Sequence, residues 1–375
     1  MPIYAFYTIL FVERGMSVTD AAVLIALWSF FAIVFEIPSG VLADRWNRKN
    51  MLAMAAVFQG VCFVIWFFSD TFLMFVLGFV FWGVAGAFTS GTEESLIFDN
   101  LKSDGCEERF TKVYGKAKFF ANVGTIVGIG SAGIIASFIR IEVISLLSAA
   151  ICFINAIFAS QMREKNFYSE RLDEKSTGFF ETFKEAAIFI KGSEVALISV
   201  LFMVLFASLG SYLDEFDALI INDFQISNIW VSVILTVRFV FIALGDILAP
   251  IVQKRISSMK QFFLISISAC AFLTLFSVIW NQYAILIFGF SFMIMAVSEV
   301  LLVNVLQNEI KEEGRATVMS FYGVGQNIAM ICFSMIYALL AGIVPLQYVY
   351  MIISIYGIAG GLSFYLFSKV KKIKM

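Results

Sequence analysis

Histidine is absent from this 375-residue sequence, and charged residues make up only 14% of it, against about 25% in soluble domains. Without histidine the chain lacks the usual metal ligand and the side chain that titrates near neutral pH, so any proton chemistry must use carboxylates. The five cysteines show no paired spacing typical of disulfide frameworks or zinc sites. Since the sequence also lacks a nucleophile–base pair and a phosphate-binding loop, we expect no enzymatic activity, no cofactor and no metal site.

Apolar residues dominate the sequence. They make up 61% of the chain, with a mean hydropathy of +0.91. A helix needs roughly 20 apolar residues to cross a hydrocarbon core about 30 Å thick, and the sequence supplies such stretches one after another. This composition predicts an all-α polytopic membrane protein that has the lipid bilayer as its surroundings. The formal net charge of −2 gives no reason to expect nucleic acid as a partner.

Charged and turn-forming residues divide the chain into twelve predicted membrane-spanning helices. We place them near residues 2–12, 21–40, 51–68, 72–98, 113–138, 142–160, 194–214, 228–250, 261–279, 282–306, 316–342 and 346–368. Three parts are therefore expected: an N-terminal six-helix bundle (1–160), a cytoplasmic linker with an amphipathic helix (161–193), and a C-terminal six-helix bundle with a short basic tail (194–375). The first span would be only about 18 Å long, so we expect that residues upstream of Met1 are missing.

The positions of lysine and arginine predict the orientation of the chain. Basic residues are retained on the cytoplasmic side during insertion. With the N-terminus inside, 23 of the 26 basic residues fall in cytoplasmic loops or the tail. The other three are Arg14, Arg140 and Arg238. The sequence therefore predicts a multi-pass protein of the cell inner (plasma) membrane with both termini in the cytoplasm.

The most specific motif lies in the loop after the second span. It reads Gly40-Val-Leu-Ala-Asp44-Arg45-Trp-Asn-Arg48-Lys49. Gly40 permits close helix approach, Asp44 can cap a neighbouring helix, and the three cations suit the anionic inner leaflet. A basic loop that merely anchors the chain to the membrane is the alternative, but it explains the cations alone.

This loop resembles motif A of the major facilitator superfamily, and the likeness is closest to bacterial drug-efflux members. The stretch of Asn308 and Arg315-Ala-Thr-Val-Met-Ser320 is similar to that family's loop before helix eleven. The resemblance implies two pseudo-symmetric six-helix bundles that alternate access to a small-molecule substrate. It also implies that Asp44 faces the N-terminus of span eleven and that Arg48 pairs with Asp99. The expected gating residues are Gly40, Asp44, Arg45, Arg48, Lys49, Asp99 and Arg315.

An internal repeat supports the same architecture. One fixed offset along the chain takes Leu42 to Leu248, Lys49 to Arg255 and Glu93 to Glu299, as well as other loop positions. Two parallel six-helix repeats would produce matches of this kind.

Ionisable and polar side chains inside apolar spans are costly in lipid and therefore indicate function. Counting along the helices places five acids in the inner third, as candidates for proton coupling: Glu36, Glu93, Glu94, Asp246 and Glu299. The substrate-cavity candidates are Arg238, Asn122, Gln326, Asn327 and Gln59.

Arg238, about 12 Å from the outer surface, leaves two interpretations open. It binds an anionic substrate group, or it is paired with an acid such as Asp246, Glu299 or the acids that end span seven. Those last acids, Asp214, Glu215 and Asp217, are otherwise expected to form a solvated helix cap.

Three functions remain open at this stage. We favour proton-coupled efflux of a small amphipathic compound or drug, which would make the chain an antiporter that works as a monomer. Gly124 to Gly130 resembles the antiporter motif of drug-efflux proteins, except that Ile129 replaces its proline. The alternatives are transport of an anionic metabolite bound by Arg238, and a non-transporting membrane sensor or lipid-moving protein.

Overall fold

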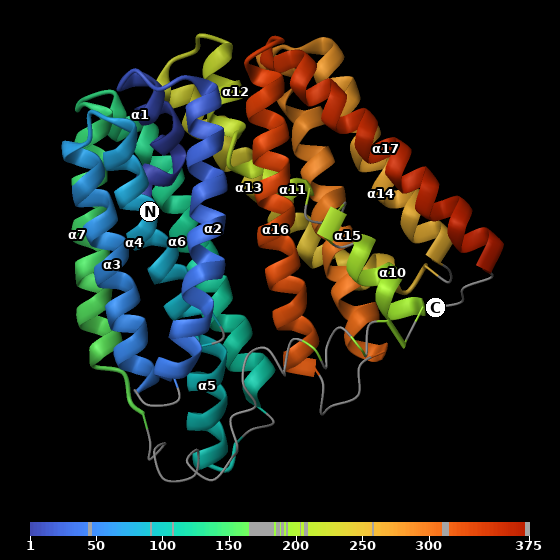
Figure 1. Cartoon of the computed structure of the whole chain (residues 1–375), viewed down its shortest axis with the longest axis horizontal. Coiled ribbons are helices and arrows are strands. Elements are labelled where there is room, and N and C mark those ends of the chain that lie inside the picture. The colour runs from blue at the N-terminus through green and yellow to red at the C-terminus, as the bar shows by residue number, and fades with distance from the viewer. Residues whose placement is uncertain are drawn as a thin grey trace. The chain divides into compact units, whose positions relative to one another are not determined.

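Every regular element in the described part of the chain is a helix (Figure 1). The computed structural model describes residues 1–43, 47–90, 92–106, 109–164, 184, 188, 191, 192, 194–202, 204, 205, 209–256, 259–309 and 315–371. The chain divides into two compact units, unit 1 (Met1–Phe179) and unit 2 (Phe180–Met375). Each unit is described separately below.

Unit 1 is a bundle of long helices. In chain order its elements are η1 (Pro2–Ala5), α1 (Tyr7–Glu13), α2 (Val18–Ala43), α3 (Arg48–Phe68), α4 (Phe72–Thr89), α5 (Thr92–Ser103), α6 (Phe110–Ala136) and α7 (Ile141–Ser160). Helix α3 packs along both α4 and α7, and α4 packs along α2. The fully buried Trp66 lies at the centre of an aromatic core, with the rings of Tyr7, Phe79 and Trp82 at 5.8, 5.0 and 5.3 Å.

Unit 2 is also a bundle of helices, and its first three described helices are short. Its elements are α10 (Glu194–Phe202), α11 (Leu209–Asp214), α12 (Asp217–Asp223), α13 (Asn228–Gln253), α14 (Met259–Ile279), η4 (Gln282–Ala284), α15 (Ile285–Glu309), α16 (Arg315–Ala341) and α17 (Leu346–Lys371). Helix α13 packs along α15, and α14 packs along α17 and α15.

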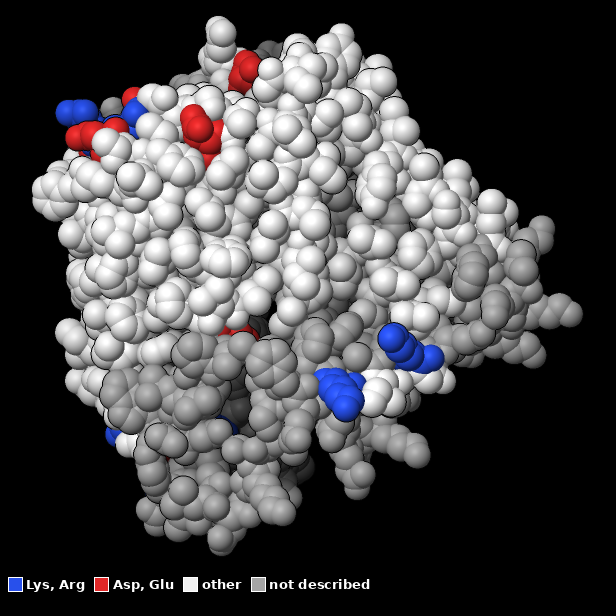
Figure 2. Space-filling model, viewed as in Figure 1, with Lys and Arg blue, Asp and Glu red and all other residues white. Residues whose placement is uncertain are grey.

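The surface of these helices suits lipid. Nine of the helices in the described part are long and apolar enough to cross a membrane, and Val123–Ala136 forms a shorter apolar segment. Large apolar side chains are exposed on them, such as Phe68 at 62% and Ile247 at 69%. In Figure 2 the charged side chains gather near the helix ends, and the surface between them is almost entirely uncharged. The predicted all-α membrane fold is confirmed.

Span four is not a continuous helix. Span four, expected at 72–98, is divided into α4 and α5, with Ser90 between them outside helical geometry (φ −54°, ψ 118°). Thr92 Oγ1 donates to the carbonyl of Phe88 across this break, at 2.8 Å. Side-chain hydroxyls can satisfy backbone carbonyls near such a break. In span seven, expected at 194–214, the described helices are α10 and α11; residues 203 and 206–208 lie outside the described set, and α12 follows α11 after Glu215 and Phe216. The Tyr212 hydroxyl donates to the carbonyl of Val204 at 2.8 Å.

Candidate functional site

The predicted gating loop is partly visible at one end of unit 1, which we call the inner end because its loops are the lysine- and arginine-rich ones. Gly40 lies near the C-terminus of α2, and Arg48 and Lys49 begin α3. Asp44 and Arg45 lie outside the described residues. Their predicted contacts, including that of Asp44 with span eleven, therefore stay predictions.

A carboxylate that the sequence interpretation missed lies at the start of α3. Glu164 accepts hydrogen bonds from the backbone amides of Arg48, at 2.8 Å, and Lys49, at 3.2 Å. The first amides of a helix have no partner within the helix and carry partial positive charge, so a carboxylate there acts as a cap. The signal in the sequence was an acid just after span six, on the same side of the membrane as the gating loop.

A second hydrogen bond joins this point to α5. Asn100 Nδ2 donates to the carbonyl of Arg163 at 2.8 Å, so Arg163 and Glu164 connect the inner ends of α3, α5 and α7. Asp99 precedes Asn100 in α5, but its side chain is outside the described set. Its pairing with Arg48 therefore stays a prediction, as does the gating role of Arg315, the first residue of α16.

The inner acids of unit 1 lie around the break in span four. Ser90 Oγ donates to Glu36 Oε1 at 3.1 Å, so the carboxylate of α2 contacts the α4–α5 connection. Glu93 lies in the first turn of α5 and is partly exposed. Glu94 follows it, with a side chain that is not described. No Lys or Arg of the described residues forms an ion pair with Glu36.

The inner acids of unit 2 lie on two tightly packed helices. A Cβ at Gly245 of α13 would overlap the carbonyl oxygen of Met293 in α15 and lie 3.0 Å from Ala296 Cβ. Asp246 follows Gly245, and Glu299 lies about one helical turn beyond Ala296. The two carboxylates are close enough to interact electrostatically. Within the described part of the chain, neither forms an ion pair with a Lys or Arg.

Arg238 is held between two acids at the other end of unit 2. Its guanidinium pairs with Asp214 of α11 and, through Nε at 2.9 Å, with Asp217 of α12. The Tyr350 hydroxyl of α17 donates to Asp217 Oδ1 at 3.1 Å. The Asp217 side chain is 0% exposed and that of Asp214 is 19% exposed. Of the two interpretations of Arg238, the structure supports pairing with the span-seven acids.

The prediction of a solvated helix cap at the end of span seven is therefore wrong for Asp217 and largely wrong for Asp214. Helix α11 ends at Asp214 and α12 begins at Asp217. A continuous helical count cannot describe this corner, which turns Asp217 toward α13 and α17. Glu215, between them, is partly exposed.

The neutral cavity candidates are not joined to Arg238 by any described contact. Gln326 and Asn327 lie on α16 and are partly buried; Asn327 Nδ2 donates to the carbonyl of Gly323 at 3.2 Å. The preceding Gly325 faces Val204, and a Cβ added at Gly325 would lie 3.1 Å from the valine side chain. Gln59 lies partly buried on α3 of unit 1. The side chain of the last candidate, Asn122, lies outside the description.

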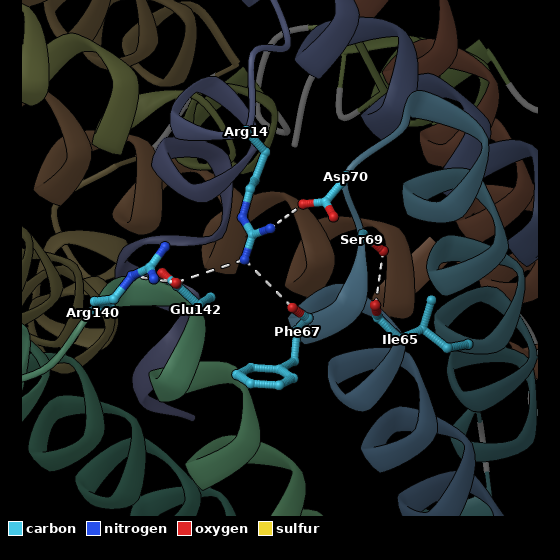
Figure 3. A network of polar contacts seen from close by, with 7 residues as sticks. All are labelled: Arg14, Ile65, Phe67, Ser69, Asp70, Arg140 and Glu142. Carbon is cyan, nitrogen blue, oxygen red and sulfur yellow. Dashed lines mark hydrogen bonds and ion pairs between the residues drawn. The ribbon is translucent and has the colours of Figure 1, made fainter.

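A further ionic cluster lies at the opposite end of unit 1, which we call its outer end (Figure 3). Arg14, just after α1, pairs with Asp70 of the α3–α4 connection and approaches Glu142 of α7 at 3.7 Å. Glu142 also pairs with Arg140, and Arg14 donates to the carbonyl of Phe67 at 3.5 Å. The cluster joins three separate segments of unit 1, so it fixes the outer end of the bundle.

Comparison with known proteins gives a consistent result. The family model described as Major Facilitator Superfamily matches residues 1–331. No curated protein matches the chain.

Several solved structures share the fold at low sequence identity. A mutant of the nucleoside transporter NupG has a TM-score of 0.79 at 15% identity, covering 96% of this chain and 94% of its own. A D-xylose-proton symporter has a TM-score of 0.74 at 14% identity, covering 97% and 94%. A bacterial homologue of the human lysosomal transporter Spinster, inward-facing and unoccupied, has a TM-score of 0.67 at 14% identity, covering 98% and 92%.

Proposed function

Since this chain belongs to the major facilitator superfamily and shares its fold with membrane transporters, we propose that it moves a small amphipathic molecule in exchange for protons. Transport would proceed by alternating access, with the two six-helix bundles (1–160 and 194–375) joined by the linker at 161–193. The proposed setting is the inner membrane, with both termini in the cytoplasm and a monomer as the working unit.

One observation carries the proton coupling: three carboxylates lie in candidate membrane spans without a basic partner. They are Glu36 in α2, Asp246 in α13 and Glu299 in α15, and among the described residues none forms an ion pair with Lys or Arg. An unpaired carboxylate in an apolar environment is costly when charged. Uptake of a proton in one state and its release in another would remove that cost, and this difference between states is what coupling requires.

The pairing of Arg238 bears on the charge of the transported molecule. Two carboxylates already neutralise its guanidinium, so an anionic substrate would have to displace them from a buried site. This supports a neutral or cationic cargo over the anionic metabolite. Export remains the proposed direction. Symport into the cell is the second candidate, because one of the structures sharing this fold is described as a D-xylose-proton symporter.

The gating residues complete the proposal. We assign Gly40, Asp44, Arg45, Arg48, Lys49, Asp99 and Arg315 to closure of the inner side. What supports this is the capping of the first α3 amides by Glu164, since it ties the gating loop to the ends of α5 and α7 and makes the loop part of one inner assembly.

The test is transport into inside-out vesicles energised by a proton gradient, with a cationic dye, a neutral drug and a small organic anion as probes. We expect the dye or the drug to accumulate and to leave when the gradient is collapsed. Glu299→Gln should abolish this accumulation. Asp223→Asn, which changes an exposed acid of the same unit, should leave it intact.

The other outcomes are equally informative. Movement of the anion alone would contradict the proposal and make Arg238 the centre of the mechanism. Uptake of a sugar or nucleoside only in right-side-out vesicles would replace export by symport. Unchanged accumulation in Glu299→Gln would exclude this carboxylate from coupling.

A further inference from the structure

The break in span four brings oxygen atoms of two helices together. Helix α4 ends at Thr89, and Ser90 leaves helical geometry before α5 begins at Thr92. At this break Ser90 Oγ lies 3.1 Å from Glu36 Oε1 of α2. A hydroxyl group and a carboxylate from separate helices therefore converge on one point of unit 1.

The carboxylate supplies negative charge at this point. Glu36 lies at the inner end of the candidate span Val18–Glu36 and is partly buried. Arg48 and Lys49 begin α3 at the same end of unit 1, yet within the described part of the chain Glu36 forms no ion pair with a Lys or Arg. A charged carboxylate in an apolar span is costly without a partner, so a cation beside it would be stabilising.

The end of α4 adds partial negative charge. The last carbonyl groups of a helix have no amide partner within it, and they form the negative end of the helix dipole. One of them, the carbonyl of Phe88, accepts a hydrogen bond from Thr92 Oγ1 at 2.8 Å. A carbonyl oxygen has two lone pairs, so it can accept this bond and still bind a cation. In membrane transporters, carbonyls at interrupted helices coordinate ions such as sodium.

The convergence point is accessible from the inner side. Counted from Phe72, Ser90 lies about 27 Å along the helix axis, close to the far side of a hydrocarbon core about 30 Å thick. Thr89 and Ser90 are both exposed, so an ion and its remaining water molecules have access. The first turn of α5 adds Glu93, which is partly exposed, and Glu94, whose side chain is outside the described set.

We propose that Glu36 Oε1, Ser90 Oγ and the carbonyl oxygens at the end of α4 bind a monovalent alkali-metal ion, sodium or potassium. One carboxylate balances one positive charge, so a monovalent ion suits the site better than a divalent one. The ion takes the place of the Ser90 hydrogen beside the carboxylate, and the hydroxyl rotates to present a lone pair to the ion. Binding of the ion is independent of the proposed function, whereas its competition with a proton for Glu36 rests on it.

Thermal unfolding of the purified full-length protein in lipid nanodiscs tests the site without a transported molecule or a gradient. The melting temperature is followed while sodium chloride or potassium chloride replaces choline chloride at constant ionic strength. An ion that binds only the folded state raises stability as its concentration exceeds the dissociation constant. We expect sodium or potassium to raise the melting temperature of the wild type. Glu36→Gln should lose this rise, and Ser90→Ala should need a higher salt concentration for it.

Two variants serve as matched controls. Asp223→Asn changes an exposed acid of unit 2 that bonds to Trp280, and Ser103→Ala removes an exposed hydroxyl that bonds within its own helix, α5. Both should keep the full rise. In the wild type, the salt concentration needed should increase about tenfold per pH unit below the pH at which Glu36 takes up a proton, because the proton and the metal ion compete for one carboxylate.

Three results would overturn the proposal. The first is the same melting temperature in sodium, potassium and choline chloride. The second is a rise that Glu36→Gln retains. The third is a rise that calcium or magnesium produces and neither monovalent ion does. Should Glu36→Gln fail to fold, a rise that neither Ser90→Ala nor acid pH weakens would overturn it instead.

Failure of this site and failure of the proposed function are distinguishable. Glu299→Gln should keep the rise in melting temperature, because Glu299 belongs to unit 2 and the measurement involves no transport. Loss of the ion effect with intact proton-driven transport would remove the ion site alone. Ion binding without any proton-driven transport would leave the site and contradict the proposed function.

Discussion

Gly245 offers the sharpest test of how unit 2 positions its inner carboxylates. In Gly245→Ala the added methyl group would overlap the carbonyl oxygen of Met293, and it would lie 3.0 Å from Ala296 Cβ. Backbone cannot rotate away as a side chain can, so α13 and α15 must separate by about 1 Å to reach ordinary contact distances. That movement would also change the spacing of Asp246 and Glu299.

The expected magnitude follows from two opposing effects. Overpacking of a tight contact costs about 1–3 kcal/mol, and a backbone contact belongs at the upper end of that range. Replacing a glycine within a helix by alanine stabilises the folded state by about 0.5–1 kcal/mol. The free energy of unfolding of Gly245→Ala should therefore fall by about 2 kcal/mol.

Gly86→Ala in α4 is the matched control, since no atom lies within 4 Å of a Cβ at that position. It should be neutral or stabilising by up to about 1 kcal/mol. The measurement is denaturant unfolding of both variants in the same detergent, together with proton-driven transport in vesicles. Equal stability of the two variants would refute the packing argument. A destabilised Gly245→Ala with full transport would show that the spacing of the two carboxylates does not matter for coupling.

Two further predictions concern unit 1. Glu142→Gln should lower the free energy of unfolding by about 2 kcal/mol, because this acid is 9% exposed and meets Arg14 and Arg140. Asp70→Asn should cost less than about 1 kcal/mol, since Asp70 is 71% exposed; the reverse order in a denaturation series would be incompatible with the burial of Glu142. Glu164→Gln should weaken the cap on α3 by about 1 kcal/mol, seen as faster hydrogen exchange at the first amides of α3, and unchanged exchange there would argue against the cap.

The architecture could be predicted from the sequence alone because the physical requirement for a membrane span is simple. A span needs about 20 apolar residues in a helix, and hydropathy detects that directly. The break in span four escaped prediction for the same reason. Average hydropathy does not change when a hydroxyl such as that of Thr92 bonds to a carbonyl of the chain.

The partners of the charged side chains could not be predicted from the sequence. Asp214 and Asp217 were among several possible partners of Arg238, and choosing between them and Asp246 required the position of the corner between α11 and α12. Glu164 was missed altogether, because its partners are backbone amides of α3, which exist at every helix start. Only the return of the chain after α7 brings this acid to that particular helix.

The two ionic clusters differ in burial. In unit 1, Arg14 and Arg140 pair with Asp70 and Glu142, and the Asp70 side chain is 71% exposed. In unit 2, Arg238 pairs with Asp214 and with Asp217, whose side chain is 0% exposed. An exposed ion pair contributes little to stability, whereas removal of one partner from a buried pair leaves an uncompensated charge and costs several kcal/mol. Asp217→Asn is therefore expected to lower the free energy of unfolding by more than Asp70→Asn does, and equal losses in a denaturation series would contradict the burial of Asp217.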